Sequence, residues 1–404
     1  MSKLACKKSQ LFVAMIWLYS GAVCAEGVIN ITPYVSVNAT HDDNVFRFNN
    51  SAQALNAFGS TATGDNIVST ELGVDANIRL SRQLIKLSAN INDNQYKRFT
   101  LLNNVGNAYS VDWNWRLGND FFGELGADQN VGISSFSENQ NPVRNIRTNN
   151  RKFASANWQF HPDWVARVNG QTGQSDNSLV SFRSINNEST SLESGLRYSN
   201  TLGTQLGLAY RNTTTTYANR TGFSLVLFGK ENTRKELIAN AAWAPTAKTR
   251  ISGSVSQVNL DYKNVPERAF SGLSERLNID YAFSTKTSFN FSVYQELNAV
   301  EDTLSTYVQS KGVSFNPAWN PTEKVMVRAG ISLEHRDYLG SSGLFISSGI
   351  KRVDEFKSAN ISLLYLPTLK SQVQLVYRKE QRTTNLPNAD YHDNTVSAAL
   401  RYNF

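Results

Sequence analysis

The chain of 404 residues has only two cysteines, Cys6 and Cys24, and both lie within its first 25 residues. This segment has three lysines near its start, then the short apolar run 11–18, and then small residues up to Ala25. We therefore predict a signal peptide over residues 1–25. A lipoprotein that begins at Cys24 is the less favoured alternative, because Val23 is a poor lipobox residue. The exported segment 26–404 then has no thiol, which excludes disulfides, thiolate metal sites and cysteine nucleophiles.

Long apolar runs and basic runs are also missing. No stretch after the signal segment approaches the roughly 18 consecutive apolar residues of a membrane-spanning helix, which excludes a helical membrane protein. The formal net charge is +7, falls to about +4 without the three signal-segment lysines, and is made of both signs scattered singly. Nucleic-acid-binding domains gather Lys and Arg on one face, so we expect no nucleic-acid partner.

Aromatic residues are abundant and alternate with polar ones. The chain has 16 Tyr and 21 Phe, and segments 71–80, 109–117, 276–283 and 396–404 all repeat with period two. In segment 109–117, one face carries Tyr109, Val111, Trp113, Trp115 and Leu117, and the other carries Ser110, Asp112, Asn114 and Arg116. Side chains of a strand point to opposite faces in turn, so each segment has one apolar and one polar side.

The connections alternate between short and long. Eight short turns lie between residues 81 and 370, and longer polar stretches such as 49–65 and 386–394 separate them. This rhythm is typical of outer-membrane barrels, whose periplasmic turns are short and external loops long. We therefore predict an all-β fold, a transmembrane antiparallel outer-membrane β-barrel over residues 26–404. About eighteen strands are expected, with sixteen possible.

A soluble propeller or stacked sandwich also predicts alternation, but with its apolar faces buried between layers. It does not predict aromatics beside the short turns. We interpret those tryptophans as the interfacial girdle of a barrel in contact with outer-membrane lipid, with sugar-stacking platforms as the alternative; they are Trp113, Trp115, Trp158, Trp164, Trp243 and Trp319.

One signature lies at the predicted outer end of the first strand, in the sequence His41-Asp42-Asp43-Asn44-Val45-Phe46-Arg47-Phe48. With shorter matches such as the terminal Arg401-Tyr402-Asn403-Phe404, it resembles the EpsL-type outer-membrane barrels that are encoded with exosortase/PEP-CTERM exopolysaccharide biosynthesis clusters. The family-like positions are Asp42, Asp43, Asn44, Phe46 and Arg47. The resemblance implies a role in moving exopolysaccharide across the outer membrane, with periplasmic or inner-membrane export components as partners.

Alternation places a set of basic side chains on the lumen side, mostly near the periplasmic end: Arg79, Lys86, Arg116, Arg167, Arg197, Arg328 and Arg401. One hypothesis is that they attract and guide an anionic polysaccharide, because charged rings select ions in pores. The alternative is that they pair with acids on neighbouring strands and stiffen the wall.

Asp42, Asp43 and Asn44 offer clustered oxygens of the kind that bind Ca²⁺. A turn-forming or loop-tethering role is favoured, because Asp and Asn hydrogen-bond nearby backbone in turns. We therefore predict no metal site and no cofactor. The long segment 49–65 is the candidate for a loop that plugs the lumen.

Catalysis is not expected. The sequence Glu334-His335-Arg336-Asp337 is suggestive, but no Ser-centred elbow or His-paired nucleophile accompanies it. The sequence thus predicts a barrel that exports or guides exopolysaccharide. A general or oligosaccharide-specific porin is the main alternative, and an outer-membrane enzyme is the third.

Overall fold

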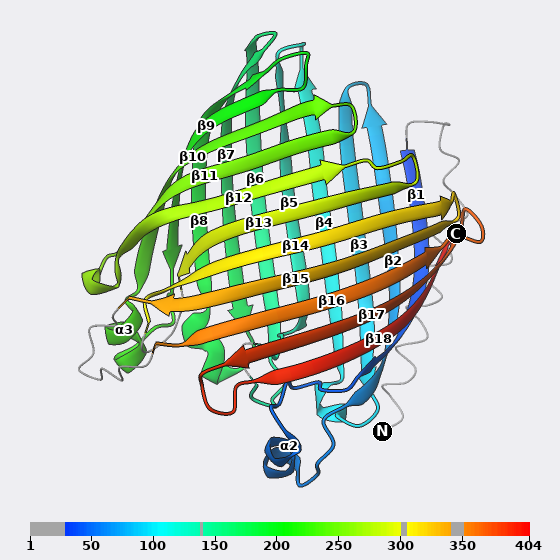
Figure 1. Cartoon of the computed structure of the whole chain (residues 1–404), viewed down its shortest axis with the longest axis vertical. Coiled ribbons are helices and arrows are strands. Elements are labelled where there is room, and N and C mark those ends of the chain that lie inside the picture. Colours follow the sequence, from blue (N-terminus) through cyan, green and yellow to red (C-terminus); the bar gives the residue numbers. More distant parts are fainter. Residues whose placement is uncertain (1–28, 138–139, 300–304, 341–350) are drawn as a thin grey trace.

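The computed structural model describes residues 29–137, 140–299, 305–340 and 351–404, so the predicted signal peptide lies outside the described residues. Eighteen antiparallel strands form one sheet, and β1 pairs with both β2 and β18, which closes the sheet into a barrel (Figure 1). The strands are β1 (Ile29–Asp42), β2 (Asp65–Leu80), β3 (Gln83–Tyr96), β4 (Asn104–Leu117), β5 (Phe121–Ile133), β6 (Ile146–His161), β7 (Trp164–Asn177), β8 (Asn187–Ser199), β9 (Gln205–Thr216), β10 (Glu231–Thr246), β11 (Thr249–Tyr262), β12 (Phe270–Tyr281), β13 (Thr287–Ala299), β14 (Tyr307–Thr322), β15 (Val325–Leu339), β16 (Val353–Tyr365), β17 (Ser371–Thr384) and β18 (Tyr391–Asn403). The predicted barrel of eighteen strands is confirmed.

The helices are short and lie in connections between strands. They are α2 (Ser51–Phe58), α3 (Gly222–Phe228) and the 3-10 turns η2 (Thr100–Leu102), η3 (Val180–Ile185) and η4 (Pro266–Arg268). Among the described residues, no helix has the length and apolar content needed to cross a bilayer.

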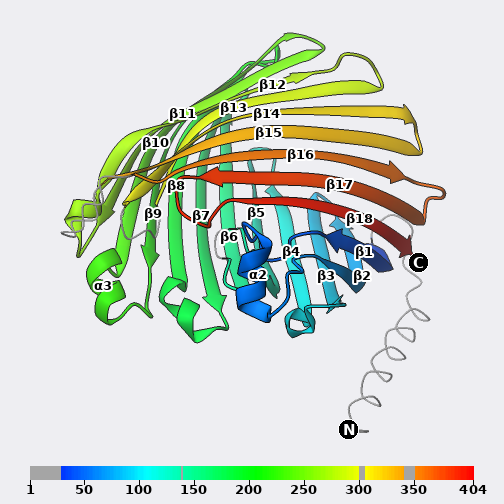
Figure 2. The same cartoon turned by 60° about the horizontal axis from the view of Figure 1, so that its bottom comes forward.

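Strand register places the apolar residues on the outside of the barrel. Ile85 of β3 lies opposite Trp113 of β4, and Trp113 lies opposite Leu125 of β5, so apolar partners share the outer face. Many of these large side chains are exposed, as expected for a surface that contacts lipid rather than a protein core. Polar residues take the inner face, and in Figure 2 the strands β10–β18 cross over β1–β8 around this polar interior.

The tryptophans near the short turns lie on the outer face, as predicted for an interfacial girdle. Trp158 and Trp243 are 50% and 55% exposed. Neighbouring rings pack side by side, for example Phe121 on Trp158 and Trp164 on Tyr198. Rings of this kind sit at headgroup depth, so the girdle marks the periplasmic boundary of the membrane.

Toward the long loops the outer face becomes polar. Outward positions there include Lys152, Lys235, Glu275, Lys311 and Lys357, which alternate with the inward residues of their strands. Charged side chains are costly on the lipid face of a barrel, most of all at mid-membrane depth. The strands therefore project beyond the hydrocarbon at the outer end.

The predicted plug, residues 49–65, does not fill the lumen. Its central part forms α2, which Figure 1 shows beyond the strand ends at the outer rim. Asn50 caps the helix by accepting a hydrogen bond from the Gln53 amide, and Gly59 ends it with a positive φ of 67°. The buried Ala54 packs in a cluster with the loop aromatics Phe46 and Phe99, which holds the segment at the rim.

Tyrosine rings brace the inside of the wall at glycines. The Tyr34 ring of β1 lies over Gly73 of β2, where an added Cβ would be 2.3 Å from the ring. The Tyr34 hydroxyl donates to Glu71 at 2.5 Å. Tyr294 lies over Gly312 in the same manner and donates to Glu334. Only glycine leaves room for a ring flat against the neighbouring strand.

We predict that Gly73→Ala destabilises the barrel by about 1–3 kcal/mol, because the new methyl group displaces the Tyr34 ring and breaks its bond to Glu71. Denaturant unfolding of the refolded barrel in detergent would measure this. Gly170→Ala is the matched control, since nothing lies within 4 Å of a Cβ there. Equal stability of the two variants would contradict the bracing role.

Candidate functional site

The predicted basic residues all take the inward positions of their strands, near the short turns. Arg79 and Lys86 alternate with the outward Ile78 and Ile85 on β2 and β3. Arg250, the second residue of β11, also takes an inward position, although it was not among the residues predicted from the sequence. We call this set the periplasmic collar: Arg79, Lys86, Arg116, Arg167, Arg197, Arg250, Arg328 and Arg401. Its eight cations outnumber the four inward carboxylates beside them, Asp75, Asp112, Glu124 and Asp280.

The collar is mostly not ion-paired. Arg401 is the exception, because its Nη2 lies 2.7 Å from Asp75 and its guanidinium lies 3.5 Å from the centre of the Tyr34 ring. Within the described residues, no carboxylate lies within 4.0 Å of the other six predicted collar cations. Arg167 instead donates to the Asn169 side chain at 2.9 Å. Pairing across strands therefore accounts for one of the seven predicted residues.

Higher in the lumen the charges are paired. Arg211 contacts Glu193 at 2.6 Å and Glu236 at 3.4 Å, and Arg234 contacts Glu236 at 3.0 Å. With Lys86 they border a luminal cavity of about 990 Å³. Arg211 and Arg234 were not predicted as lumen residues, although the same alternation places them inward. The lumen thus has a balanced middle and a positively charged periplasmic end.

Aromatic rings inside the lumen are covered by guanidinium groups. Arg116 lies over Phe122 at 5.4 Å, and Arg151 lies over Phe153 at 4.9 Å from the ring centre. Such cation–π contacts stabilise the cation, and the N–H edge of Arg151 also donates to Asp128 at 2.7 Å. Arginine therefore covers a face of the Phe122 ring and a face of the Phe153 ring. These rings hold guanidinium groups in place and do not present an uncovered platform for stacking.

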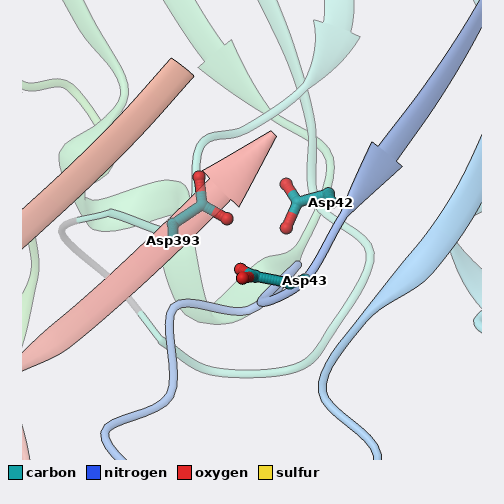
Figure 3. A group of neighbouring side chains, drawn as sticks. All are labelled: Asp42, Asp43 and Asp393. Atoms are coloured by element: carbon teal, nitrogen blue, oxygen red, sulfur yellow. The ribbon is translucent and has the colours of Figure 1, made fainter. Parts of the chain in front are cut away.

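The family-like signature forms a lock at the barrel seam. Arg47 of the first outer loop lies 3.0 Å from Asp42 at the end of β1 and 3.0 Å from Asp393 near the start of β18. The backbone of Arg47 has a positive φ of 58°, so its guanidinium turns back over the strand end. Figure 3 shows Asp42 and Asp393 facing each other with Asp43 beside them. The lock joins the first strand to the last.

Asn44 and Asp43 complete the lock through the backbone. The Asn44 side chain donates to the carbonyls of Phe48 and His392 at 2.8 and 2.9 Å, and it accepts from the Phe48 amide. Asp43 accepts from the backbone and side-chain nitrogens of Asn394 at 2.8 and 2.7 Å. Phe46, fully buried, anchors the loop in the rim cluster. The arrangement matches the predicted loop-tethering role.

The three carboxylates of Asp42, Asp43 and Asp393 lie within 4.8 Å of one another, close enough to suggest a cation site. However, protein donors already occupy nearly all of their oxygens, and only Oδ1 of Asp393 has no hydrogen-bond partner. The guanidinium of Arg47 takes the position of the counter-ion. The residues therefore do not fit a Ca²⁺ site, which needs six or more free oxygen ligands.

The balance of charges keeps Arg47 cationic. Burial is the largest single influence and lowers its pKa, but the Asp42 and Asp393 carboxylates outweigh it and raise the pKa above the usual value. A buried ion pair of this kind contributes little more to stability than an apolar contact would. Removing one partner, however, leaves the other charged groups buried without a counter-ion.

His335, the histidine of the sequence Glu334-His335-Arg336-Asp337, lies outside the lumen. His335 takes an outward position on β15, and its ring nitrogens lie 2.5 Å from Glu355 and 3.0 Å from Asp337. His41 contacts the Asn66 side chain at 2.9 Å at the outer end of β1. Neither histidine faces the cavity where a substrate would pass.

Comparisons with known proteins bear on the fold. No family model matches the chain, and no curated protein matches it in sequence. Among solved structures, it is similar to OccK1 (OpdK) of Pseudomonas aeruginosa, with a TM-score of 0.51 and 7% identity over 93% of this chain and 99% of that one. It is also similar to the ferric enterobactin receptor PfeA of P. aeruginosa, with a TM-score of 0.50 and 9% identity over 93% and 81%. The protein is thus a β-barrel of the bacterial outer membrane.

We predict that Arg47→Met lowers the stability of the barrel by about 3–5 kcal/mol, because it leaves the carboxylates of Asp42 and Asp393 buried without a cation. Thermal unfolding in detergent, with limited proteolysis of the outer loops, would measure the change. Arg82→Met is the control, since Arg82 lies exposed in a short turn and bonds only to the next turn.

We also predict that millimolar Ca²⁺ leaves the melting temperature of the wild-type barrel unchanged. The reason is that Arg47 and backbone donors occupy the oxygens that the ion would need. A rise in melting temperature with Ca²⁺, reversed by a chelator, would show that the cluster is a metal site after all.

Proposed function

We propose that the barrel conducts an anionic exopolysaccharide from the periplasm to the cell surface. The observation that carries this proposal is the periplasmic collar, a ring of mostly unpaired cations at the end where an exported polymer enters. Such a ring raises the local concentration of an anionic chain, because charges in a low-dielectric channel focus the field. The polysaccharide itself is supported by the likeness of residues 41–48 to the EpsL-type barrels.

The paired middle of the lumen suits a moving polymer. A chain that met unpaired cations along its whole path would be held at every step. Here Arg211 and Arg234 are neutralised by Glu193 and Glu236, so strong attraction is confined to the entrance. Binding that is favourable at entry and weak beyond it is what conduction requires.

A porin for small anionic solutes is the second candidate. The collar serves a small anion as well as a polymer, and the similar fold of OccK1 (OpdK) is that of an outer-membrane protein of comparable length. The proposed transport needs no catalytic group, so we propose that the barrel is not an enzyme. Screening the purified protein for lipase, protease and glycoside hydrolase activity would test this.

Replacing Arg79, Arg116 and Arg328 together by Gln removes three unpaired collar cations. We expect the permeability ratio of anions to cations to fall severalfold, because the entrance loses its positive field. Reversal potentials in planar bilayers under a salt gradient would measure the ratio.

The control is Lys152→Gln with Lys235→Gln and Lys357→Gln, which removes the same charge from the outer face. Its permeability ratio should match the wild type. An unchanged ratio in the arginine variant would show that the collar does not steer anions.

Deletion of the protein would separate the two transport functions. We expect loss of surface polysaccharide with normal uptake of small solutes, and rescue of the polysaccharide by the wild type but only partly by the collar variant. Loss of small-solute uptake with normal polysaccharide would instead support the porin.

A further inference from the structure

Four consecutive short turns of the barrel are built in the same way. They follow β10, β12, β14 and β16, and Figure 1 shows these strands ending one after another along one edge of the barrel. Each turn has Thr or Ser, then any residue, then Lys, and the Thr or Ser hydroxyl accepts a hydrogen bond from the Lys amide at 3.2 or 3.3 Å. We call these lysines the lysine rim: Lys248, Lys286, Lys324 and Lys370.

Neighbouring turns hold the lysine rim in place. The carbonyl of each rim lysine accepts from a backbone amide at the end of the adjoining strand, at 2.7 or 2.8 Å. Two side chains also reach along the rim, because Lys286 Nζ donates to the Pro321 carbonyl at 2.7 Å and Lys324 Nζ donates to the Pro367 carbonyl at 3.2 Å. Turns bonded to one another in this way present their charges in a fixed row.

The protein does not neutralise the charge of the lysine rim. All four residues are exposed, and in the part of the chain that the structure describes no carboxylate lies within 4.0 Å of any of them. The turns that hold them contain one acid, Glu323. Exposed cations of this kind add little to the stability of a fold, since water and salt screen them. Their charge is therefore available to a partner outside the barrel.

The other four short turns lack such a row. The turn after β2 carries Arg82, which donates to the next turn. The turns after β4 and β6 carry Asp120 and Asp163, and the turn after β8 is uncharged. Asp163 takes the position that lysine has in the repeated turn, since its amide donates to the His161 ring at 3.2 Å. The turns are therefore positive on the β10–β17 side of the periplasmic mouth and neutral or negative on the β4–β9 side.

This asymmetry favours a discrete partner over the lipid of the inner leaflet. A leaflet surrounds the barrel on all sides, so lysines that only bound lipid phosphates would be expected on every turn. Leu369, next to Lys370, is fully exposed at the tip of the last turn of the row. An apolar anchor beside fixed cations suits a protein surface, where apolar contacts and complementary charges act together. A chain of anionic sugars would gain nothing from the leucine.

We propose that the lysine rim is the docking surface for a soluble periplasmic protein with an acidic face. The partner binds over the β10–β17 side of the mouth and leaves collar residues of the other side, such as Arg116 and Arg167, open to the periplasm. This docking gives a place and a chemistry to the periplasmic partner expected from the sequence. It holds for any solute that the barrel conducts, so it does not rest on the proposed export of polysaccharide.

Photo-crosslinking in cells that make the full barrel would test the docking. The probe is p-benzoylphenylalanine in place of Leu369 and, as the matched control, in place of Leu202. Both leucines are exposed in short turns, at 104% and 79%, but Leu202 lies in the uncharged turn after β8. We expect the probe at Leu369 to give one adduct with a soluble periplasmic protein, identified by mass spectrometry, and the probe at Leu202 to give none.

Charge variants then show whether this adduct depends on the lysine rim. Replacing all four rim lysines by Gln should lower its yield at least about fivefold, and replacing them by Arg should preserve it, because Arg keeps the charge. The control removes the same charge from the outer face by Lys152→Gln, Lys235→Gln, Lys311→Gln and Lys357→Gln. Its yield should match the wild type.

The purified barrel in nanodiscs of phosphatidylethanolamine provides a second readout, with a fluorescent polyglutamate peptide as probe. We expect the Gln variant of the rim to weaken peptide binding at least about fivefold. The collar variant with Arg79, Arg116 and Arg328 replaced by Gln should have the smaller effect. The opposite order would show that the peptide binds in the lumen and would overturn the rim as the acidic-face site.

The crosslinks decide between the remaining occupants. An adduct at Leu369 that the Gln variant loses and the Arg variant keeps supports the docking surface. No protein adduct there, equal adducts at Leu202, or an adduct that survives the Gln variant would overturn it. An adduct with phospholipid alone would assign the lysines to the inner leaflet and overturn it as well. Folded-barrel mobility on gels confirms that every variant compared is folded.

Discussion

The structure depends on one constraint: inside a bilayer, every backbone N–H and C=O must find a partner within the protein. A sheet meets this constraint only by closing on itself, so the chain must bring its first strand to its last. Here the closure runs from Tyr34 opposite Asn403 to Asp42 opposite Thr395. The lock of Arg47 with Asp42 and Asp393 lies at the outer end of that seam, where strands far apart in the chain would otherwise separate most easily.

The same constraint explains where irregularity is tolerated. Three strand pairs shift register near the short turns, between Trp158 and His161, between Trp243 and Thr246, and between Trp319 and Thr322, at the level of the aromatic girdle where the hydrocarbon ends. At the outer end the outward residues become polar and water can satisfy free backbone groups, so β12 and β13 diverge at that level. Ser274 and Arg234 bond the two backbone groups of Leu297 there, and Leu297 packs in a buried apolar cluster with Val258 and Phe270. The level at which β12 and β13 diverge is therefore the level at which lipid stops enforcing the ladder.

Local sequence patterns predict most of the fold. Most of the features that the sequence could not predict depend on contacts between residues far apart in the chain. Period-two alternation is a property of neighbouring residues, so the strands, their inward face and the aromatic girdle were predictable. Asp43 meets Asn394 across a sequence separation of 351, and no local signal marks Asp393 as a partner of Arg47. The plug prediction for residues 49–65 was wrong for a related reason: the apolar residues of α2 are matched by Phe46 and Phe99, and only the fold brings those together.

Whether a lumen cation is ion-paired distinguishes charges that stabilise the wall from charges that remain available to a transported anion. If lumen cations served only to stiffen the wall, each would gain from a carboxylate within reach, as Arg211 does from Glu193 and Glu236. Lys86 lies opposite Asn77 and Asp112 in the register, yet no ion pair of 4.0 Å or less forms between Lys86 and Asp112. Leaving cations unpaired in a wet lumen costs little, since water solvates them, but it also adds nothing to stability. A ring of such charges confined to one end of the barrel is therefore better explained by what enters at that end than by the needs of the fold.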